Sequence, residues 1–252
     1  MRILISNDDG IFADGIYALF RELKKLGEVI AIAPDSEQSA VGHAITLMTP
    51  LRISQVNRHG HFFGYAVNGT PADCVKLGVH AVLPQPPDII VSGINLGANV
   101  GTSVIYSGTV SAATEGTILG IPSIAISLAT FAEPDFSFAA KFARKLAKSV
   151  LQHGLPGGTL LNVNVPAVPE SEIAGVEVTI HSRSHFEDLF EKRLDPRNRT
   201  YYWQAGLEQT FDTRDGVDAA ALRRNCISVT PIHFDMTDYE HLSEIRSWDL
   251  SL

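Results

Sequence analysis

Short apolar runs alternate with helical patterns from the start of the chain to about residue 165. The runs have the length of buried strands and contain few polar residues. They are Ile3–Ile5, Val29–Ala33, Asp88–Val91, Ser123–Leu128 and Leu160–Val165. Between the first two runs, apolar residues recur on one helical face from Ile16 to Leu26. Strands that alternate with helices in this way predict an α/β fold, in which helices cover both faces of a mostly parallel sheet.

Local signals predict where the helices begin and end. Gly27 is expected to end the helix that contains Ile16 and Leu26. Thr70 has the properties of an N-cap, with Pro71 in the first turn and Asp73 at the third position. Two further helices are predicted from Thr109 to Leu119 and from about Phe136 to Val150.

The pattern changes beyond residue 170. Apolar residues alternate with others from Val176 to Ile180, which predicts a half-buried strand. Interleaved charges follow from Arg183 to Arg199, and Tyr201–Trp203 and Cys226–Val229 indicate further strands. This part of the chain is expected to leave the core.

We therefore divide the chain into a core, residues 1–170, and a hairpin-rich C-terminal part, residues 171–252. A two-stranded hairpin is marginally stable in water when it packs on nothing. The extended hairpin and the terminal segment are therefore expected to pack on a partner subunit of a homo-oligomer.

The composition excludes several classes of partner. The 252 residues carry a net charge of −8, which argues against a nucleic-acid surface and against binding to an anionic membrane. The apolar run before Asp8 is too short for a signal peptide, and no apolar stretch approaches the length of a membrane span. Cys74 and Cys226 lie far apart, which suits reduced thiols in a cytoplasmic protein.

Concentrated negative charge directly follows the first predicted strand, where Asp8 and Asp9 precede Gly10. Two adjacent carboxylates at the end of a buried strand contribute little to folding and usually need a cation. Ligands of open α/β sheets bind at the carboxyl ends of the strands. Asp8 and Asp9 are therefore candidate metal ligands, and a solvated turn with a helix-capping Asp is the alternative.

Two more loops are expected at the same edge of the sheet, residues 34–43 and 92–101. They bring the Ser39 hydroxyl and the Asn95 amide oxygen toward the two carboxylates. An all-oxygen set of donors favours Mg²⁺ or Mn²⁺ over zinc. The alternatives are a turn or cap role for Ser39 and a left-handed loop conformation for Asn95. His43 is expected to be a solvated loop residue.

The residues Ser107, Gly108 and Thr109 begin a predicted helix. Backbone N–H groups at such a start, together with the two hydroxyls, could bind a phosphate beside the metal. An N-cap residue followed by a packing glycine is the alternative. The sequence contains no P-loop, dinucleotide-binding or nucleophile-elbow motif.

The motifs resemble those of the SurE family of stationary-phase survival proteins, which are metal-dependent 5′-nucleotidases. The resemblance rests on Ser6–Gly10, Ala33–Asp35, Gly69–Val75, Val91–Gly97 and Tyr106–Val110. It extends in order to Asn162–Pro166, Asp195–Arg197, Tyr202–Trp203 and Ser228–Pro231. The match therefore covers nearly the whole chain.

The resemblance implies a Rossmann-like core and hydrolysis of nucleoside monophosphates. It implies one divalent cation per subunit, held by Asp8, Asp9, Ser39 and Asn95. It also implies a homodimer or homotetramer that exchanges C-terminal segments, in agreement with the excursion from about residue 180 to 205.

These observations predict a phosphomonoesterase of nucleoside 5′-monophosphates, with 3′-monophosphates and short polyphosphate as further possible substrates. The cation would polarise a phosphoryl oxygen and activate a water. Asp8 or Asp9 would orient or deprotonate this water, or one of them would attack phosphorus directly. Asn95, Ser107, Gly108 and Thr109 are the predicted substrate-binding residues. The alternative is a nucleotide-sensing or nucleotide-binding oligomer with little turnover.

Overall fold

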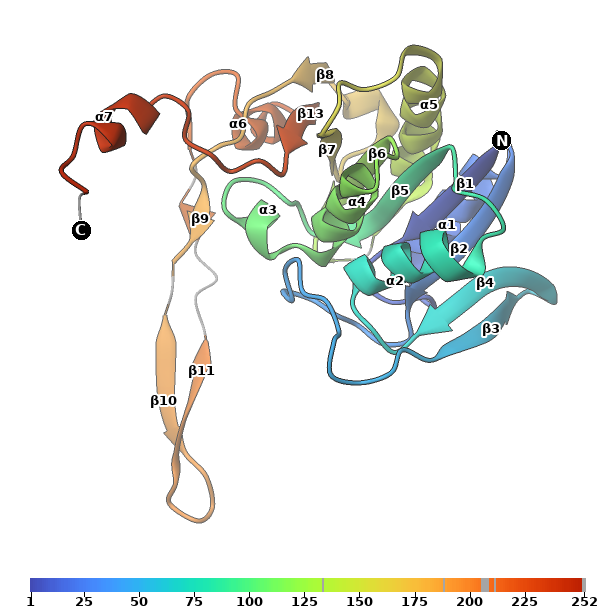
Figure 1. Cartoon of the computed structure of the whole chain (residues 1–252), viewed down its shortest axis with the longest axis horizontal. Helices are drawn as coiled ribbons and strands as arrows, with labels where there is room; N and C mark the ends of the chain where they lie inside the picture. Colours follow the sequence, from blue (N-terminus) through green and yellow to red (C-terminus); the bar gives the residue numbers. More distant parts are fainter. Residues whose placement is uncertain (133, 188, 205–208, 211, 251–252) are drawn as a thin grey trace.

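The computed structural model describes residues 1–132, 134–187, 189–204, 209–210 and 212–250 (Figure 1). Within this part of the chain, a nine-stranded sheet has the order β3-β4-β2-β1-β5-β6-β7-β13-β8. Its strands are β1 (Arg2–Ser6), β2 (Glu28–Pro34), β3 (Ile53–Arg58), β4 (His61–Val67), β5 (Ile89–Leu96), β6 (Ser123–Ala129), β7 (Thr159–Pro166), β8 (Gly175–Val178) and β13 (Cys226–His233). In the sheet order, the neighbouring strands β4, β2, β1, β5, β6 and β7 run parallel to one another. At the two ends of this set, β3 pairs antiparallel with β4, and β13 pairs antiparallel with β7. The predicted, mostly parallel sheet is confirmed.

Helices cover both faces of this sheet. The helices α1 (Asp14–Leu23) and α5 (Ser137–His153) share one apolar core, and α2 (Pro71–Leu77) and α4 (Gly108–Ile118) lie on the opposite face. In β1, Ile3 and Ile5 belong to the first core and Leu4 to the second. Burial on both faces is the reason why the strand sequences are continuously apolar.

The remaining described helices are short: α3 (Ser103–Tyr106), α6 (Asp218–Arg223) and α7 (Leu242–Arg246), with helical turns at Gly78–Val82 and Glu170–Glu172. Among the residues that the structure describes, no helix has the length and apolarity needed to cross a membrane. Cys74 and Cys226 are buried free thiols.

One predicted helix end is confirmed and one is wrong. The helix α2 begins with the expected capping box, because the Thr70 side chain accepts from Asp73 N–H and the Asp73 carboxylate accepts from Thr70 N–H. The helix α1 ends at Leu23 instead of continuing to Gly27. A Cβ on Gly27 would lie 2.5 Å from the Met1 carbonyl oxygen. Gly27 therefore permits a close approach between chain segments and does not cap the helix.

The strand β5 continues beyond the expected end at Val91 and reaches Leu96. Its pairing with β6 shifts register between Ser92 and Asn95. Gly93 has φ of +134°, and a Cβ at this position would lie 2.3 Å from the Ile126 carbonyl oxygen. The glycine-rich motif that we assigned to a loop is therefore partly an irregular piece of strand, which glycine allows.

The C-terminal part contributes both to the sheet and to an extension. The strands β8 and β13 complete the central sheet, although both lie within residues 171–252. An antiparallel hairpin of β10 (Phe190–Leu194) and β11 (Thr200–Gln204) projects away from the sheet (Figure 1). The short strands β9 (His185–Phe186) and β12 (Gln209–Thr210) pair nearer its base. The structure thus contains the predicted hairpin.

The expected half-buried strand near residue 176 is present as β8, but its apolar residues are not the buried ones. The side chains of Val176 and Val178 in β8, and of Ile180 just beyond it, are exposed, whereas Thr179, directly after β8, is buried and its hydroxyl bonds to that of Thr230 at 2.7 Å. The strand lies at the edge of the sheet next to β13. Alternation alone predicted the strand, but it did not tell which of its faces meets the core.

Candidate active site

Asp8 and Asp9 follow β1, a central strand of the sheet that pairs with β2 and β5. Asp8 is 5% exposed, and Asp9 is less deeply buried. The Asn7 side chain donates to the Gly10 carbonyl oxygen at 3.0 Å and closes the turn that carries both carboxylates. The carboxylates therefore lie at the carboxyl edge of the sheet, where α/β proteins bind their ligands.

The N-terminus of α4 meets the Asp8 carboxylate. The Thr109 hydroxyl donates to Asp8 Oδ1, and backbone N–H groups of Gly108 and Thr109 also bond to the carboxylate. A Cβ on Gly108 would lie 2.7 Å from Asp8 Cβ, so this close packing requires glycine. Burial raises the pKa of Asp8, while these hydrogen bonds act in the opposite direction. The helix terminus therefore stabilises a negative charge on Asp8.

Asp9 lies in a negative environment. Burial, followed by the charges of Asp8 and Glu37, raises the pKa of Asp9 to about 7, although a hydrogen bond from Leu96 N–H lowers it. Repulsion between two adjacent carboxylates is relieved when a cation binds between them. Glu37 is an acidic neighbour that the sequence analysis did not single out, although it lies in the same loop as Ser39.

The other two predicted ligands lie on segments that meet this pair, Ser39 in the loop after β2 and Asn95 near the end of β5. The Gln38 N–H donates to the Asp8 carbonyl oxygen at 2.8 Å, so the residue before Ser39 is bonded to the acidic turn. The Ser39 hydroxyl itself donates to Glu37 Oε1 at 2.6 Å. Asn95 directly precedes Leu96, whose N–H meets Asp9, and Asn95 Nδ2 donates to the Gly97 carbonyl oxygen at 2.8 Å.

The chemistry of these donors fits a hard divalent cation. Among the interactions that shift the pKa values of Asp8 and Asp9, none comes from a positively charged side chain. In the described part of the chain, no group of three or more His, Cys, Asp or Glu side chains is arranged to hold a metal. A cation here would therefore take hydroxyl or amide oxygens and water besides the two carboxylates, which is typical of Mg²⁺ and Mn²⁺.

The residues predicted to bind phosphate lie in the same place. Ser107 is the N-cap of α4 and accepts from Val110 N–H at 3.1 Å. Thr109 is fully buried, and its hydroxyl donates to Asp8. The start of α4 therefore lies next to the acidic pair. Some of its hydrogen-bond donors, the Thr109 hydroxyl and the N–H groups of Gly108 and Thr109, already bond to Asp8. Phosphate binding by Ser107, Gly108 and Thr109 stays a prediction.

His43 has a partner that the sequence did not indicate. Its Nε2 lies 2.9 Å from Oε2 of the buried Glu115 in α4. Lys76 in α2 donates to the other oxygen of Glu115 at 2.6 Å. His43 is exposed in a loop, as expected, but it also bonds to a buried carboxylate. Because His43 and Glu115 are 72 residues apart in the sequence, local patterns carry no signal for this contact.

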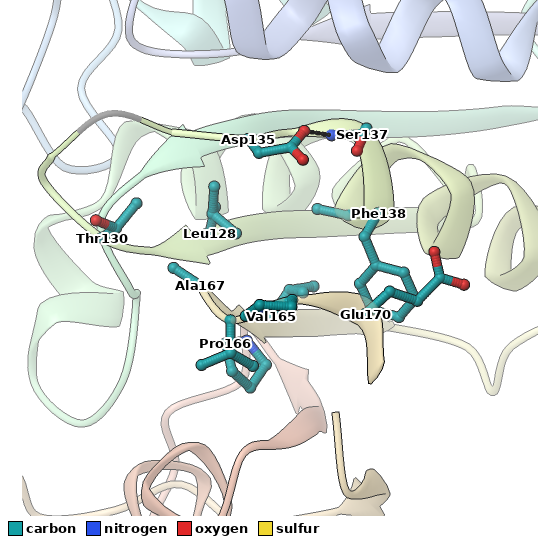
Figure 2. Close-up of a pocket in the computed structure, with 12 residues that line it drawn as sticks. Leu128, Thr130, Asp135, Ser137, Phe138, Val165, Pro166, Ala167 and Glu170 are labelled. Carbon is teal, nitrogen blue, oxygen red and sulfur yellow. Dashed lines mark hydrogen bonds between the residues drawn. The ribbon is translucent and has the colours of Figure 1, made fainter. Parts of the chain in front are cut away.

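A cavity of about 470 Å³ lies at the carboxyl ends of β6 and β7 (Figure 2). Leu128, Phe138 and Val165 line it, and Asp135 and Glu170 add carboxylates. Leu128 pairs with Leu96, next to Asn95. The cavity and the acidic pair thus lie at the same edge of the sheet, but β5 separates β1 from β6, and neither Asp8 nor Asp9 lines the cavity.

The fold and the site together define a class: an α/β protein with an acidic, all-oxygen site at the carboxyl edge of a parallel sheet. The family described as "Survival protein SurE" matches residues 3–188. The chain belongs to the SurE family.

Full-length relatives carry a functional name. The "5′-nucleotidase SurE" of Syntrophobacter fumaroxidans is 50% identical and covers 99% of this chain and 100% of its own length. The protein of the same name from Geobacter sulfurreducens is also 50% identical and covers 100% of this chain and 95% of its own length. The crystal structure of the SurE protein from Aquifex aeolicus has a TM-score of 0.85 at 41% identity and covers 98% of both chains.

Proposed function

We propose that this protein is a metal-dependent 5′-nucleotidase that hydrolyses nucleoside 5′-monophosphates to nucleoside and phosphate. The observation that carries the proposal is an acidic pair at the end of a central strand, with Asp8 buried, whose pKa values are shifted by no cationic side chain among the described residues. The names of the full-length relatives support the same reaction.

In this proposal Asp8, Asp9, Ser39 and Asn95 hold one Mg²⁺ or Mn²⁺. The bound cation would polarise a phosphoryl oxygen and lower the pKa of a water. Asp8 is held in one orientation by Thr109 and the α4 terminus. Asp9 is the more exposed of the two and has better access to water. It is the stronger candidate to orient or deprotonate the attacking water, with direct attack by a carboxylate as the alternative.

Phosphate release with and without Mn²⁺ tests the proposal. Release of phosphate from AMP only in the presence of the metal is expected. Binding of AMP without release would favour the alternative of a nucleotide-sensing oligomer. The same assay with 3′-AMP and with short polyphosphate decides whether these are substrates as well.

Replacing Ser107 by Ala should raise the KM for AMP and weaken the inhibition by inorganic phosphate, with little change in Mn²⁺ affinity. The reason is that donors at the start of a helix meet an anion and not a cation. Inhibition by phosphate and Mn²⁺ titration by calorimetry measure the two effects. Thr114→Ala is the matched control, because its hydroxyl bonds to Val110 O in the same helix. A weaker Mn²⁺ affinity with unchanged phosphate inhibition would contradict the assignment.

We further propose a cytoplasmic homodimer or homotetramer that uses the hairpin, residues 190–204. Five large apolar side chains of the hairpin are between 40% and 63% exposed: Phe190, Leu194, Tyr201, Tyr202 and Trp203. Exposed aromatic side chains on a hairpin that leaves the core indicate an interaction surface. The buried free thiols support a reducing compartment.

Replacing Tyr202 and Trp203 together by Ser should lower the oligomeric state, because the hairpin would lose its largest aromatic surface. Light scattering at micromolar concentration measures the molar mass. Phe62→Ser is the control, since Phe62 is 47% exposed on β4, away from the hairpin. An unchanged mass of the double variant would remove the hairpin from the interface, and a wild-type monomer would refute the oligomer.

A further inference from the structure

The loop that carries Ser39, residues 35–46, contains no helix or strand. We refer to it as the Ser39 loop. Ala40 and Gly42 have positive φ angles of 57° and 60°. A left-handed conformation is unfavourable for Ala. The position of this loop therefore depends on contacts with the rest of the protein.

Two elements hold the ends of the loop. The Gln38 N–H bonds to the Asp8 carbonyl oxygen at 2.8 Å. Near the other end, the Thr70 hydroxyl donates to the Ala44 carbonyl oxygen at 2.7 Å, and Thr46 donates to the Asp73 carboxylate. These contacts fix the two ends, but they do not fix the turn between them.

The turn is held by α4 and the residues just before it. The Gly42 N–H donates to the Tyr106 carbonyl oxygen at 2.9 Å. The His43 ring bonds to Glu115 at 2.9 Å, and this is a side-chain contact between the loop and α4. The side chain of Glu115 is 3% exposed and that of His43 is 31% exposed. A buried carboxylate gives this contact a defined geometry.

The direction of the hydrogen bond follows from the charge of Glu115. The bond from His43, and then that from Lys76, lowers the pKa of Glu115, so it is an ionised carboxylate at neutral pH. An ionised carboxylate only accepts, and His43 Nε2–H is therefore the donor. Lys76 bonds to the same carboxylate from α2 and does not lie in the loop.

We infer that His43 is a positioning residue, which through Glu115 holds the Ser39 loop in the place where Ser39 can serve as a metal ligand. The helix α4 contacts both the acidic pair and the Ser39 loop. Its first residues bond to Asp8, and Glu115, further along the helix, bonds to His43. The ligand role of Ser39 rests on the proposed function, whereas the anchoring of the loop does not. Residues that orient ligands in this way typically affect metal affinity by about 10-fold to 100-fold.

Hydrogen exchange in the metal-free protein tests the anchoring. His43→Ala should speed exchange of the Ser39 loop about 10-fold, because the loop opens without unfolding the core. His43→Gln should restore the wild-type rate, since its amide nitrogen can donate in place of Nε2. Lys76→Met is the matched control, because it removes the other side-chain bond to Glu115, which comes from α2 and not from the loop. Faster exchange in Lys76→Met to the same extent as in His43→Ala would overturn the inference.

Mn²⁺ titration by calorimetry then tests the consequence for the site. His43→Ala and Glu115→Gln should each weaken Mn²⁺ binding about 10-fold, and His43→Gln and Lys76→Met should bind as the wild type does. In steady-state assays His43→Ala should require more Mn²⁺ for half-maximal rate and keep its kcat at saturating Mn²⁺. Unchanged Mn²⁺ affinity in His43→Ala would overturn the inference. Wild-type protein that binds no Mn²⁺ would instead overturn the proposed metal site, and the exchange data would still decide the anchoring.

Discussion

Replacing Asp8 by Asn should lower the turnover of AMP on the order of 10²-fold or more. Asn keeps the shape of the side chain but removes a charged ligand from the proposed cation. It also weakens the bonds from Thr109 and the α4 terminus, since these donors currently meet a negative charge. Phosphate release at saturating Mn²⁺ measures the effect. Asp9→Asn should act in the same direction.

Chelation by EDTA should abolish the activity, and added Mn²⁺ or Mg²⁺ should restore it. Asp14→Asn is the control for a lost carboxylate, because the side chain of Asp14 is 87% exposed at the start of α1, where it pairs with Arg58. It should keep the wild-type rate. Full activity of the metal-free wild type, or of Asp8→Asn, would refute the metal-dependent mechanism.

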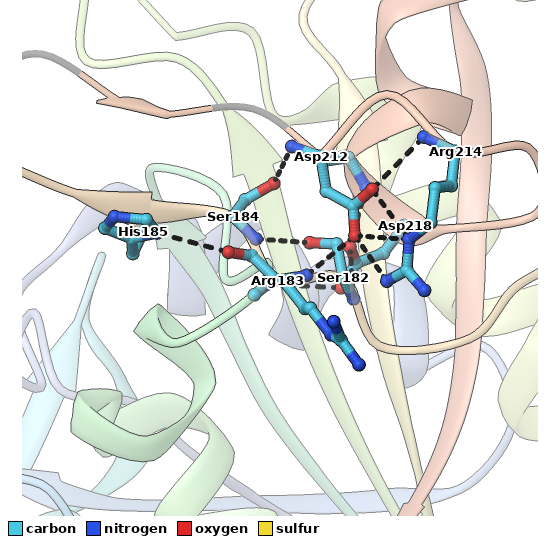
Figure 3. A network of polar contacts seen from close by, with 9 residues as sticks. Ser182, Arg183, Ser184, His185, Asp212, Arg214 and Asp218 are labelled. Atoms are coloured by element: carbon cyan, nitrogen blue, oxygen red, sulfur yellow. Dashed lines mark hydrogen bonds and ion pairs between the residues drawn. The ribbon is translucent and has the colours of Figure 1, made fainter.

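Replacing Asp218 by Ala should lower the free energy of unfolding by about 3 kcal/mol, because several buried donors lose the carboxylate that accepts from them. Asp218 is fully buried and accepts from the N–H groups of Ser182 at 3.2 Å, Ala219 at 2.7 Å and Gly101 at 3.3 Å. Figure 3 shows it near Ser182 and Asp212. Urea unfolding followed by circular dichroism measures the loss.

The control for this variant is Asp215→Ala, three residues earlier in the chain, with a fully exposed side chain. It should leave the unfolding midpoint unchanged. An equal loss of unfolding free energy in both variants would show that Asp218 stabilises the protein through its charge alone and not through its bonds to the three N–H groups. Asp218 accepts from the N–H of Gly101, which ends the segment 92–101 that carries Asn95. Asp218→Ala should therefore also weaken Mn²⁺ binding more than Asp215→Ala does.

The sheet and its covering helices could be predicted because their signals are local. Burial on two faces makes Ile3, Leu4 and Ile5 all apolar, and the capping box of Thr70 and Asp73 lies within four residues. Such patterns depend on the period of the backbone and on the first turn of a helix. The wrong predictions, the end of α1 and the end of β5, depend on contacts of Gly27 and Gly93 with distant carbonyl groups.

The site divides in the same way. The pair of Asp8 and Asp9 could be found as a candidate from the sequence, since charge at the end of a buried strand is a local conflict. The sequence also placed Thr109 near this pair, but it assigned the hydroxyl to a phosphate, and the structure places it on Asp8, 101 residues away.

The sequence by itself determined the alternation of buried strands with helices, and hence a mostly parallel sheet. It also determined the acidic turn after β1 and the presence of a C-terminal hairpin. Each of these features depends on residues that lie close together in the chain. Only the tertiary structure decided that α4 stabilises Asp8 and that His43 meets a buried Glu115. It also decided that β8 and β13 complete the central sheet. These contacts join segments whose separation in the chain leaves no periodic pattern, and they form only when the packed sheet and helices bring the segments together.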